Sequence, residues 1–242
     1  MLSDDAVPGP DTARQDGAPV TYDDTWLVVP LYNEAEVIHD VVTHARETFP
    51  NIVCVDDGSV DDSGARATAA GAVVVSHPIN LGQGAAIQTG IEFALRRPSC
   101  RYVVTFDSDG QHRTEDAAAM VDRLRKDEAD VVFGSRFLDG RTKPGLMKKL
   151  VLKTAIAFSN ATSGVHLTDT HNGLRAFNRT GAAALSIKQN RMAHASEIVD
   201  QVGKAGLRYT EQPVHILYTD YSRKKGQSLL NSVNILTELL YK

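Results

Sequence analysis

Short, continuously apolar runs recur along the first half of the chain, separated by segments in which apolar residues have helical spacing. The apolar runs lie at residues 25–30, 51–57, 72–76, 102–106 and 129–136. The helical segments lie at residues 34–49, 61–70, 82–97 and 115–127. Strands without an alternating polar face are typical of parallel sheets that helices cover. The pattern therefore predicts an α/β fold with a mostly parallel sheet flanked by helices on both faces.

The regular alternation of strands and helices ends near residue 140. The elements expected beyond it are an amphipathic helix at 143–164, a loop running into a strand at 169–178, a helix at 194–206, a strand at 208–218, a basic loop at 221–228 and a final helix at 229–241. No linker interrupts this order, so we predict one domain over residues 25–242. Residues 1–24 are rich in Pro, Gly, Asp and Thr and lack hydrophobic periodicity, which predicts a disordered arm.

The composition changes this picture little, but it argues against several classes of protein. The chain has 242 residues, of which 42% are hydrophobic and 23% charged, and its net charge is −4. No overall positive field attracts nucleic acid. The two cysteines form no disulfide framework, and we find neither a run of about 20 apolar residues nor a signal-peptide core. We therefore expect a cytoplasmic protein that does not bind nucleic acid.

Polar residues cluster immediately after the predicted strands. The clusters lie at residues 30–34, 56–59, 80–84, 107–111 and 134–136. Turn and helix-cap chemistry explains any one of them, because Asp, Asn, Gly and Ser are favoured at such positions. In an open parallel sheet, however, ligands bind beyond the carboxyl ends of the strands. A series of five clusters therefore predicts a binding site along this edge.

The cluster at residues 107–111 brings two carboxylates, Asp107 and Asp109, into one small space with the amide of Gln111. Neighbouring carboxylates repel each other, and the pKa of one rises unless a cation lies close by. Divalent cations such as Mg²⁺ bind oxygen ligands, commonly one or two carboxylates together with substrate phosphates. The cluster therefore predicts half of a metal site that a nucleotide diphosphate completes, with the metal acting as a Lewis acid.

Four segments together resemble the catalytic domain of glycosyltransferase family 2, with its GT-A fold. They are VVPLYNEAEVI, VDDGSVDDSG, NLGQGAAIQTGI and FDSDGQH, and the resemblance covers about residues 25–228. The chain is most similar to the polyprenyl-phosphate sugar synthases, the dolichol-phosphate mannose and glucose synthase group, through GSR, DTHNGLRAF and RKKGQS. The resemblance implies a Rossmann-like GT-A sheet, a nucleotide-sugar half at residues 25–140 and an acceptor half at residues 141–242.

The resemblance also implies roles for the matched positions on the donor side. The implied nucleotide-sugar contacts are Pro30, Tyr32, Asn33, Glu34, Asp56, Asp57, Gln83, Gly84, Asp107 and Ser108. Within this set, Asp57 would hydrogen-bond the base and Asp56 would support it. The metal, Mg²⁺ or Mn²⁺, would bind Asp109 and Gln111 with help from Asp107.

On the acceptor side, the resemblance implies that Arg136 and Arg175 bind the acceptor phosphate. Arg223, with Lys224 or Lys225, would bind donor or acceptor phosphates. The implied catalytic residues are Asp107, Asp109, Arg136 and Arg175. The chain departs from the group at one point, because Leu229 follows Ser228 where a basic residue is usual.

These residues suit a metal-dependent, inverting transfer of a sugar to a polyprenyl or dolichyl phosphate. A phosphate monoester is largely ionised at neutral pH and needs placement and charge compensation more than a base. Arginine provides a planar fork that matches phosphate oxygens. The likeness of NLGQGAA to the glucose-type members favours a UDP-sugar as donor, and GDP-mannose remains possible.

Two alternatives remain open from the sequence. Transfer to a sugar hydroxyl of a polysaccharide or glycolipid would need a carboxylate base, and Glu197 is the candidate. A protein that binds nucleotide-sugars without catalysis is the other alternative, although the intact DSDGQ segment and the candidate arginines argue against it.

A lipid acceptor requires contact with a membrane surface. The helix expected at 229–241 carries apolar residues at helical spacing, namely Leu229, Leu230, Val233, Leu236, Leu239 and Leu240. Basic residues accompany it at Lys143, Lys148, Lys149, Lys153, Arg223, Lys224 and Lys225, and such residues favour anionic headgroups. We expect peripheral association with the cytoplasmic face of a membrane, beside a separately encoded small membrane protein. Packing of the last helix on the sheet is the alternative.

Overall fold

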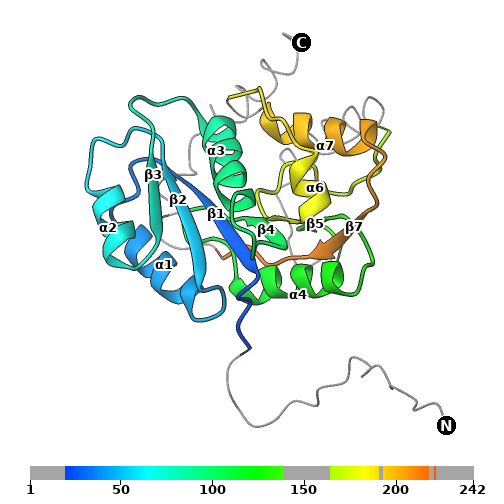
Figure 1. The fold of residues 1–242 in the computed structure, drawn as a ribbon, viewed down its shortest axis with the longest axis horizontal. Coiled ribbons are helices and arrows are strands. Elements are labelled where there is room, and N and C mark those ends of the chain that lie inside the picture. Colours follow the sequence, from blue (N-terminus) through cyan, green and yellow to red (C-terminus); the bar gives the residue numbers. More distant parts are fainter. Residues whose placement is uncertain (1–19, 139–163, 191–192, 218–220, 222–242) are drawn as a thin grey trace, which may run out of the picture.

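The computed structural model describes residues 20–138, 164–190, 193–217 and 221. Its centre is a seven-stranded sheet with the strand order β3-β2-β1-β4-β6-β5-β7 (Figure 1). The strands are β1 (Thr25–Leu31), β2 (Asn51–Asp56), β3 (Val73–Ser76), β4 (Tyr102–Thr105), β5 (Val131–Ser135), β6 (Arg175–Asn178) and β7 (Tyr209–Pro213). Only β6 runs antiparallel to its neighbours among these strands. The prediction of a mostly parallel sheet is confirmed.

Helices pack on both faces of the sheet, as predicted. They are α1 (Ile38–Arg46), α2 (Ser63–Ala69), α3 (Gln83–Leu95), α4 (Thr114–Arg125), α6 (Arg179–Ala183) and α7 (His194–Lys204). One cluster of buried side chains joins the sheet to α1, α2 and α4, and a second joins it to α3, α6 and α7. Burial of each large apolar side chain contributes about 1.5–3 kcal/mol, so these two cores hold the layers together.

The strand register brings together the polar segments that follow the carboxyl ends of β1, β2 and β4. All seven residues of β1 are buried, and Leu31 at its end pairs with Asp56 at the end of β2. Thr105, the last residue of β4, pairs with Val28 of β1. The chain segments that follow these parallel strands therefore emerge side by side.

The structure changes some boundaries of the predicted elements. The helix expected from residue 34 begins only at Ile38, because the Glu34 amide donates to Ser63 Oγ and the Ala35 amide to Asp61 Oδ2. The strand expected at 208–218 is shorter, since the His215 amide donates to Asp116 Oδ2 instead of to a neighbouring strand. The elements expected at 143–164 and 229–241, and most of the basic loop 221–228, lie outside the described residues.

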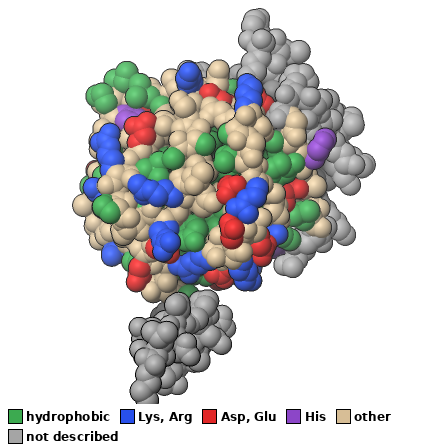
Figure 2. All heavy atoms as spheres, turned by 45° about the vertical axis from the view of Figure 1, so that its right-hand side comes forward, with side chains coloured by type: hydrophobic (Ala, Val, Ile, Leu, Met, Phe, Trp, Pro, Cys, Tyr) green, Lys and Arg blue, Asp and Glu red, His purple; other side chains and the backbone are tan. Residues whose placement is uncertain are grey.

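Charges of both signs are intermixed on the molecular surface. On the face shown in Figure 2, Lys and Arg side chains neighbour those of Asp and Glu. Arg208, for example, forms ion pairs with Asp127 at 2.6 Å and Asp130 at 3.0 Å. Exposed pairs of this kind contribute little to stability.

Candidate functional site

A cavity of about 390 Å³ opens at the carboxyl ends of β1, β2 and β4. Its lining residues are Pro30, Leu31, Tyr32, Glu34, Asp57, Asn80, Gly82, Gln83, Ala86, Asp107, Ser108 and Asp109. Most of the positions predicted to contact a nucleotide-sugar are therefore brought together around one space. Leu31, Asn80, Gly82 and Ala86 had no predicted role of their own, although Asn80 and Gly82 belong to one of the polar clusters.

Three predicted positions, Asn33, Asp56 and Gly84, are not among the residues that line this cavity. Asn33 has a φ of 53° and ties two loops together, because its amide donates to Ser59 Oγ at 3.0 Å while its Oδ1 accepts from the Val60 amide at 2.9 Å. Asp56 accepts from the Ser59 amide at 2.9 Å. In this structure Asn33 and Asp56 hold the loops that surround the cavity.

Gly84 lies at the start of α3, against a segment from the second half of the chain. Its amide donates to the Asn190 carbonyl at 3.0 Å, and a Cβ at this position would lie 2.0 Å from the Gln189 carbonyl oxygen. Only a residue without a side chain allows this close approach. The α3 side of the cavity therefore depends on the 189–190 segment.

Glu197, the candidate base of the alternative reaction, holds this same segment in place. Its carboxylate accepts from the amides of Lys188, at 3.1 and 3.0 Å, and Gln189, at 2.8 Å. Gln201 Nε2 also donates to it at 3.2 Å. These contacts give Glu197 a supporting position behind α3, and its role as a base stays a prediction of the alternative.

The two acids after β4 have different surroundings. Asp107 accepts from His112 Nε2 at 2.8 Å and from Gln83 Nε2 at 3.2 Å. Burial is the largest single influence and opposes its ionisation, but the attraction and hydrogen bond of His112, together with the attraction of His194 and Arg175, hold the pKa of Asp107 below its usual range. Asp109 accepts from the backbone amide of Gln111 at 3.0 Å. Burial, and after it repulsion from Asp107, raises the pKa of Asp109 to about 6. A cation between the acids would relieve this repulsion.

The donor set fits the predicted half-site for a divalent metal. Asp107 and Asp109 both line the cavity. Within the described part of the chain, no group of three or more His, Cys, Asp or Glu residues could hold a metal ion. Two carboxylates are nevertheless enough where phosphate oxygens supply the other ligands. Gln111 is not a lining residue of this cavity, and its role as a ligand stays a prediction.

The loop before β6 packs directly against Asp107. Thr105 Oγ1 donates to the Gly173 carbonyl at 2.6 Å. A Cβ on Gly173 would lie 2.4 Å from Asp107 Oδ2, which is closer than side chains allow. Glycine at this position therefore lets the loop support the Asp107 carboxylate. The sequence marked this segment through NGLRAF but did not place it beside the acids.

We expect Gly173→Ala to displace the Asp107 carboxylate and to lower the rate of sugar transfer about 10- to 100-fold, because misplaced catalytic groups lose much of their effect. Steady-state kinetics and a thermal unfolding curve would test this expectation. Lys126→Ala is a suitable control, since Lys126 is exposed at the end of α4. Unchanged turnover in Gly173→Ala would contradict the supporting role of the loop.

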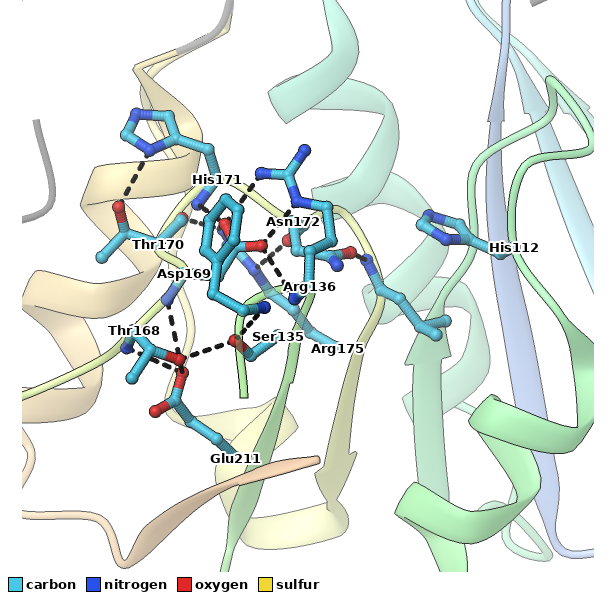
Figure 3. A network of polar contacts seen from close by, with 12 residues as sticks. His112, Ser135, Arg136, Thr168, Asp169, Thr170, His171, Asn172, Arg175 and Glu211 are labelled. Atoms are coloured by element: carbon cyan, nitrogen blue, oxygen red, sulfur yellow. Dashed lines mark hydrogen bonds and ion pairs between the residues drawn. The ribbon is translucent and has the colours of Figure 1, made fainter. Parts of the chain in front are cut away.

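Arg136, predicted to bind the acceptor phosphate, pairs with a buried acid (Figure 3). Its Nε and Nη2 donate to Asp169 Oδ2 and Oδ1 at 2.6 and 2.8 Å. Asp169 is 2% exposed. Thr168 and Glu211 extend the network, because Glu211 Oε1 accepts from the Thr168 amide and hydroxyl, each at 2.9 Å. The ion pair fixes the guanidinium at the end of β5, and a phosphate contact by Arg136 stays a prediction.

Arg175 departs from the sequence expectation, because it is buried rather than exposed toward an acceptor. Its Nε donates to the Asn172 carbonyl at 3.1 Å, and its Nη2 donates to the carbonyls of Thr170 at 2.9 Å and Ala195 at 3.3 Å. Burial lowers its pKa to about 10. A guanidinium suits backbone carbonyls as well as phosphates, since all are oxygen acceptors. Arg175 therefore holds the loop before β6 against the start of α7.

The remaining predicted phosphate ligands, Arg223, Lys224 and Lys225, lie outside the described residues. Sequence reasoning missed Asp169 and gave His112 no firm role. Both lie within quoted motifs, Asp169 as the first residue of DTHNGLRAF and His112 as the last of FDSDGQH, which is the signal that could have identified them. Their partners could not be named from the sequence.

A family model described as Glycosyl transferase family 2 matches residues 26–183. A UDP-N-acetylglucosamine–dolichyl-phosphate N-acetylglucosaminyltransferase of Methanococcus voltae is 28% identical, and the alignment covers 89% of this chain and 94% of that protein. A polyprenol monophosphomannose synthase of Mycolicibacterium smegmatis is 33% identical, with coverage of 64% of this chain and 62% of that protein.

Among solved structures, the chain is similar to glucosyl-3-phosphoglycerate synthase from Mycobacterium tuberculosis in complex with Mg²⁺ and uridine diphosphate. The TM-score is 0.67 at 21% sequence identity, and the match covers 90% of this chain and 79% of that chain. At this identity the likeness establishes the fold. The GT-A fold that the sequence resemblance predicted is confirmed.

Proposed function

Because the chain belongs to glycosyltransferase family 2, we propose that it transfers a sugar, with inversion, from a nucleotide diphosphate sugar to a polyprenyl or dolichyl phosphate. The observation that carries this proposal is the pair Asp107 and Asp109 on the wall of a cavity that three strand ends build. The relatives from Methanococcus voltae and Mycolicibacterium smegmatis support a lipid phosphate acceptor, since their names state one.

The cavity offers separate surfaces for the parts of the donor. Tyr32 is 44% exposed and lines the cavity beside Pro30, so an aromatic face is available for stacking on a base. Asp107 and Asp109 lie on the β4 side of the same space. Asp109 would hold a Mg²⁺ or Mn²⁺ ion against the diphosphate, and the ion would neutralise the leaving group. The donor sugar would then lie beside Asp107.

The acceptor side requires positioning rather than proton removal. A lipid phosphate is already largely ionised at neutral pH, so it can attack the anomeric carbon directly while the nucleotide diphosphate departs from the opposite face. We assign Arg136 to the acceptor phosphate. Its guanidinium is oriented by the Asp169 carboxylate, which lies 2.6 Å away. Orientation of this kind supplies much of the rate enhancement in transfers between two bound substrates.

A screen of donors tests the proposal. Purified protein is incubated with radiolabelled UDP- and GDP-sugars and polyprenyl phosphate in the presence of Mn²⁺, and the labelled lipid is extracted and counted. We expect a UDP-sugar to be the best donor, with GDP-mannose included because one relative is named as a mannose-transferring enzyme. A parallel incubation offers an oligosaccharide in place of the lipid; label on the oligosaccharide, and never on polyprenyl phosphate, would contradict the proposal.

Removal of divalent metal should abolish transfer. In EDTA we expect labelled lipid to fall to background, because Asp107 and Asp109 would then repel the diphosphate instead of binding it through a cation. Added Mg²⁺ or Mn²⁺ should restore activity, while added Na⁺ at the same ionic strength should not. Full activity in EDTA would exclude a catalytic metal.

A lipid acceptor also places the reaction at a membrane surface. Among the described residues, no helix is both long enough and apolar enough to cross a membrane. We propose peripheral association with the cytoplasmic face, through the basic and apolar segments recognised in the sequence. A separately encoded small membrane partner stays a prediction. Flotation of the protein with vesicles that contain polyprenyl phosphate measures the association directly.

A further inference from the structure

A chain of hydrogen bonds lies behind the cavity wall formed by the segment after β3. His77 Nδ1 lies 2.7 Å from Asp57 Oδ1, and His77 Nε2 lies 2.9 Å from Thr89 Oγ1 on α3. The side chains of His77 and Asp57 are 9% and 4% exposed. A neutral imidazole donates through one ring nitrogen and accepts through the other. His77 can therefore satisfy both neighbours at once and join α3 to the carboxylate.

The Asp57 carboxylate in turn holds the turn that forms the wall. Its Oδ1 accepts from the Leu81 amide at 2.9 Å, and its Oδ2 accepts from the Gly82 amide at 2.7 Å. Gly82 has a φ of 101°, which favours glycine. Asn80, Gly82 and Gln83 all line the cavity. The position of this wall thus depends on the orientation of one carboxylate.

We propose that His77 is a positioning residue for the nucleotide: it fixes the Asp57 carboxylate, which fixes the turn at residues 80–82. The inference rests on the proposed function in one respect, namely that this cavity binds the nucleotide. His77 is not a lining residue of the cavity, so it acts through Asp57. Its influence falls on donor affinity and not on the chemical step.

The expected effect is a selective loss of donor affinity. Without the imidazole, the Asp57 carboxylate loses its hydrogen bond to His77, and the turn at residues 80–82 loses its rigid support. Hydrogen bonds of this kind correspond to about a 10-fold change in an equilibrium constant, and often more. We expect His77→Gln to weaken nucleotide binding and raise the donor KM about 10-fold, with kcat changed less than about 3-fold.

The chain offers well-matched variants for the test. Asparagine places an amide donor near the position of Nδ1 and retains the contact with Asp57, whereas glutamine places it near Nε2 and does not. Thr89→Val removes only the hydroxyl that supports the far side of the ring. His39→Gln is the control, because His39 also neighbours an aspartate, Asp40 at 3.2 Å, but lies on the exposed face of α1.

The measurements are calorimetric titration with UDP and with GDP in Mn²⁺, thermal unfolding, and kinetics with the donor varied. Support requires that His77→Gln binds the better nucleotide about 10-fold more weakly, that His77→Asn recovers most of the affinity, and that His39→Gln matches the wild type. Thr89→Val should show a smaller loss in the same direction. If His77→Gln fails to fold, Thr89→Val and His77→Asn carry the comparison.

Three outcomes separate the possible failures. If the wild-type protein binds neither nucleotide, the proposed function fails, whatever the variants do. If the wild type binds a nucleotide and both His77→Gln and Thr89→Val bind it with wild-type affinity, the positioning role is overturned while the proposed function stands. If His77→Asn and His77→Gln lose stability and affinity to the same extent, His77 is a general packing residue and the inference is also overturned.

Discussion

Asp109→Asn should lower kcat for sugar transfer by a factor of about 100 to 1,000, because the loss of one metal ligand costs several kcal/mol of transition-state stabilisation and each 1.36 kcal/mol is tenfold in rate. The variant should keep its fold. Burial and Asp107 raise the pKa of Asp109 to about 6, so the ionised carboxylate destabilises the metal-free folded state as the pH rises through this value. Asparagine removes that cost.

The comparison uses initial rates at saturating metal together with thermal unfolding at pH 5 and pH 8. In metal-free protein the melting temperature of Asp109→Asn should equal or exceed that of the wild type at pH 8, with a smaller difference at pH 5. Asp23→Asn is the control, since Asp23 is exposed and precedes the amino-terminal end of β1, away from the cavity at the carboxyl ends of the strands. Wild-type kcat in Asp109→Asn would remove Asp109 from the metal site.

Arg175→Met should destabilise the protein by about 3–5 kcal/mol, because it removes one side of a buried, charge-assisted network. Three backbone carbonyls, from Thr170, Asn172 and Ala195, would lose their donor. The nearby acids Asp107 and Asp169 would also lose a cation that interacts with them. For a protein of this size the loss corresponds to a fall of roughly 10 °C in melting temperature.

Melting temperature and acceptor kinetics together distinguish two roles for Arg175. A supporting role predicts a large thermal shift, and a direct phosphate contact predicts a raised acceptor KM with little thermal shift. Arg101→Met is the control, because Arg101 is exposed and its amide, not its side chain, donates to the Asp24 carbonyl. An unchanged melting temperature with a strongly raised acceptor KM would restore the role that the sequence resemblance implied.

Several details could not be predicted because they depend on which distant residue is adjacent. Arg136 is chemically apt for a phosphate, and the structure adds that Asp169, 33 positions later, accepts from its Nε and Nη2. Glu197 is apt for a base, yet the amides of Lys188 and Gln189 bind it. A guanidinium or a carboxylate has the same hydrogen-bonding capacity in either role. Residue type therefore identified the candidates, and only the structure showed which neighbours hold each of them.

The sequence by itself determined the fold class and the location of the candidate site. Continuously apolar strands that alternate with amphipathic helices specify a covered parallel sheet, and the carboxyl ends of such strands share one edge. For this reason Tyr32, Asp57, Gln83, Asp107 and Asp109, which are far apart along the chain, all line one cavity.

Only the tertiary structure decided the supports behind this cavity. The insertion of β6 between β4 and β5, antiparallel to both, brings Gly173 against Asp107. It also lets the Gly173 carbonyl accept from Thr105 Oγ1, 68 positions earlier in the chain. The packing of α3 on β1 and β2, with the pairing of β2 and β3, gives His77 its two partners, Thr89 and Asp57. No local pattern encodes such contacts, because they depend on how elements pack and not on the spacing within any one of them.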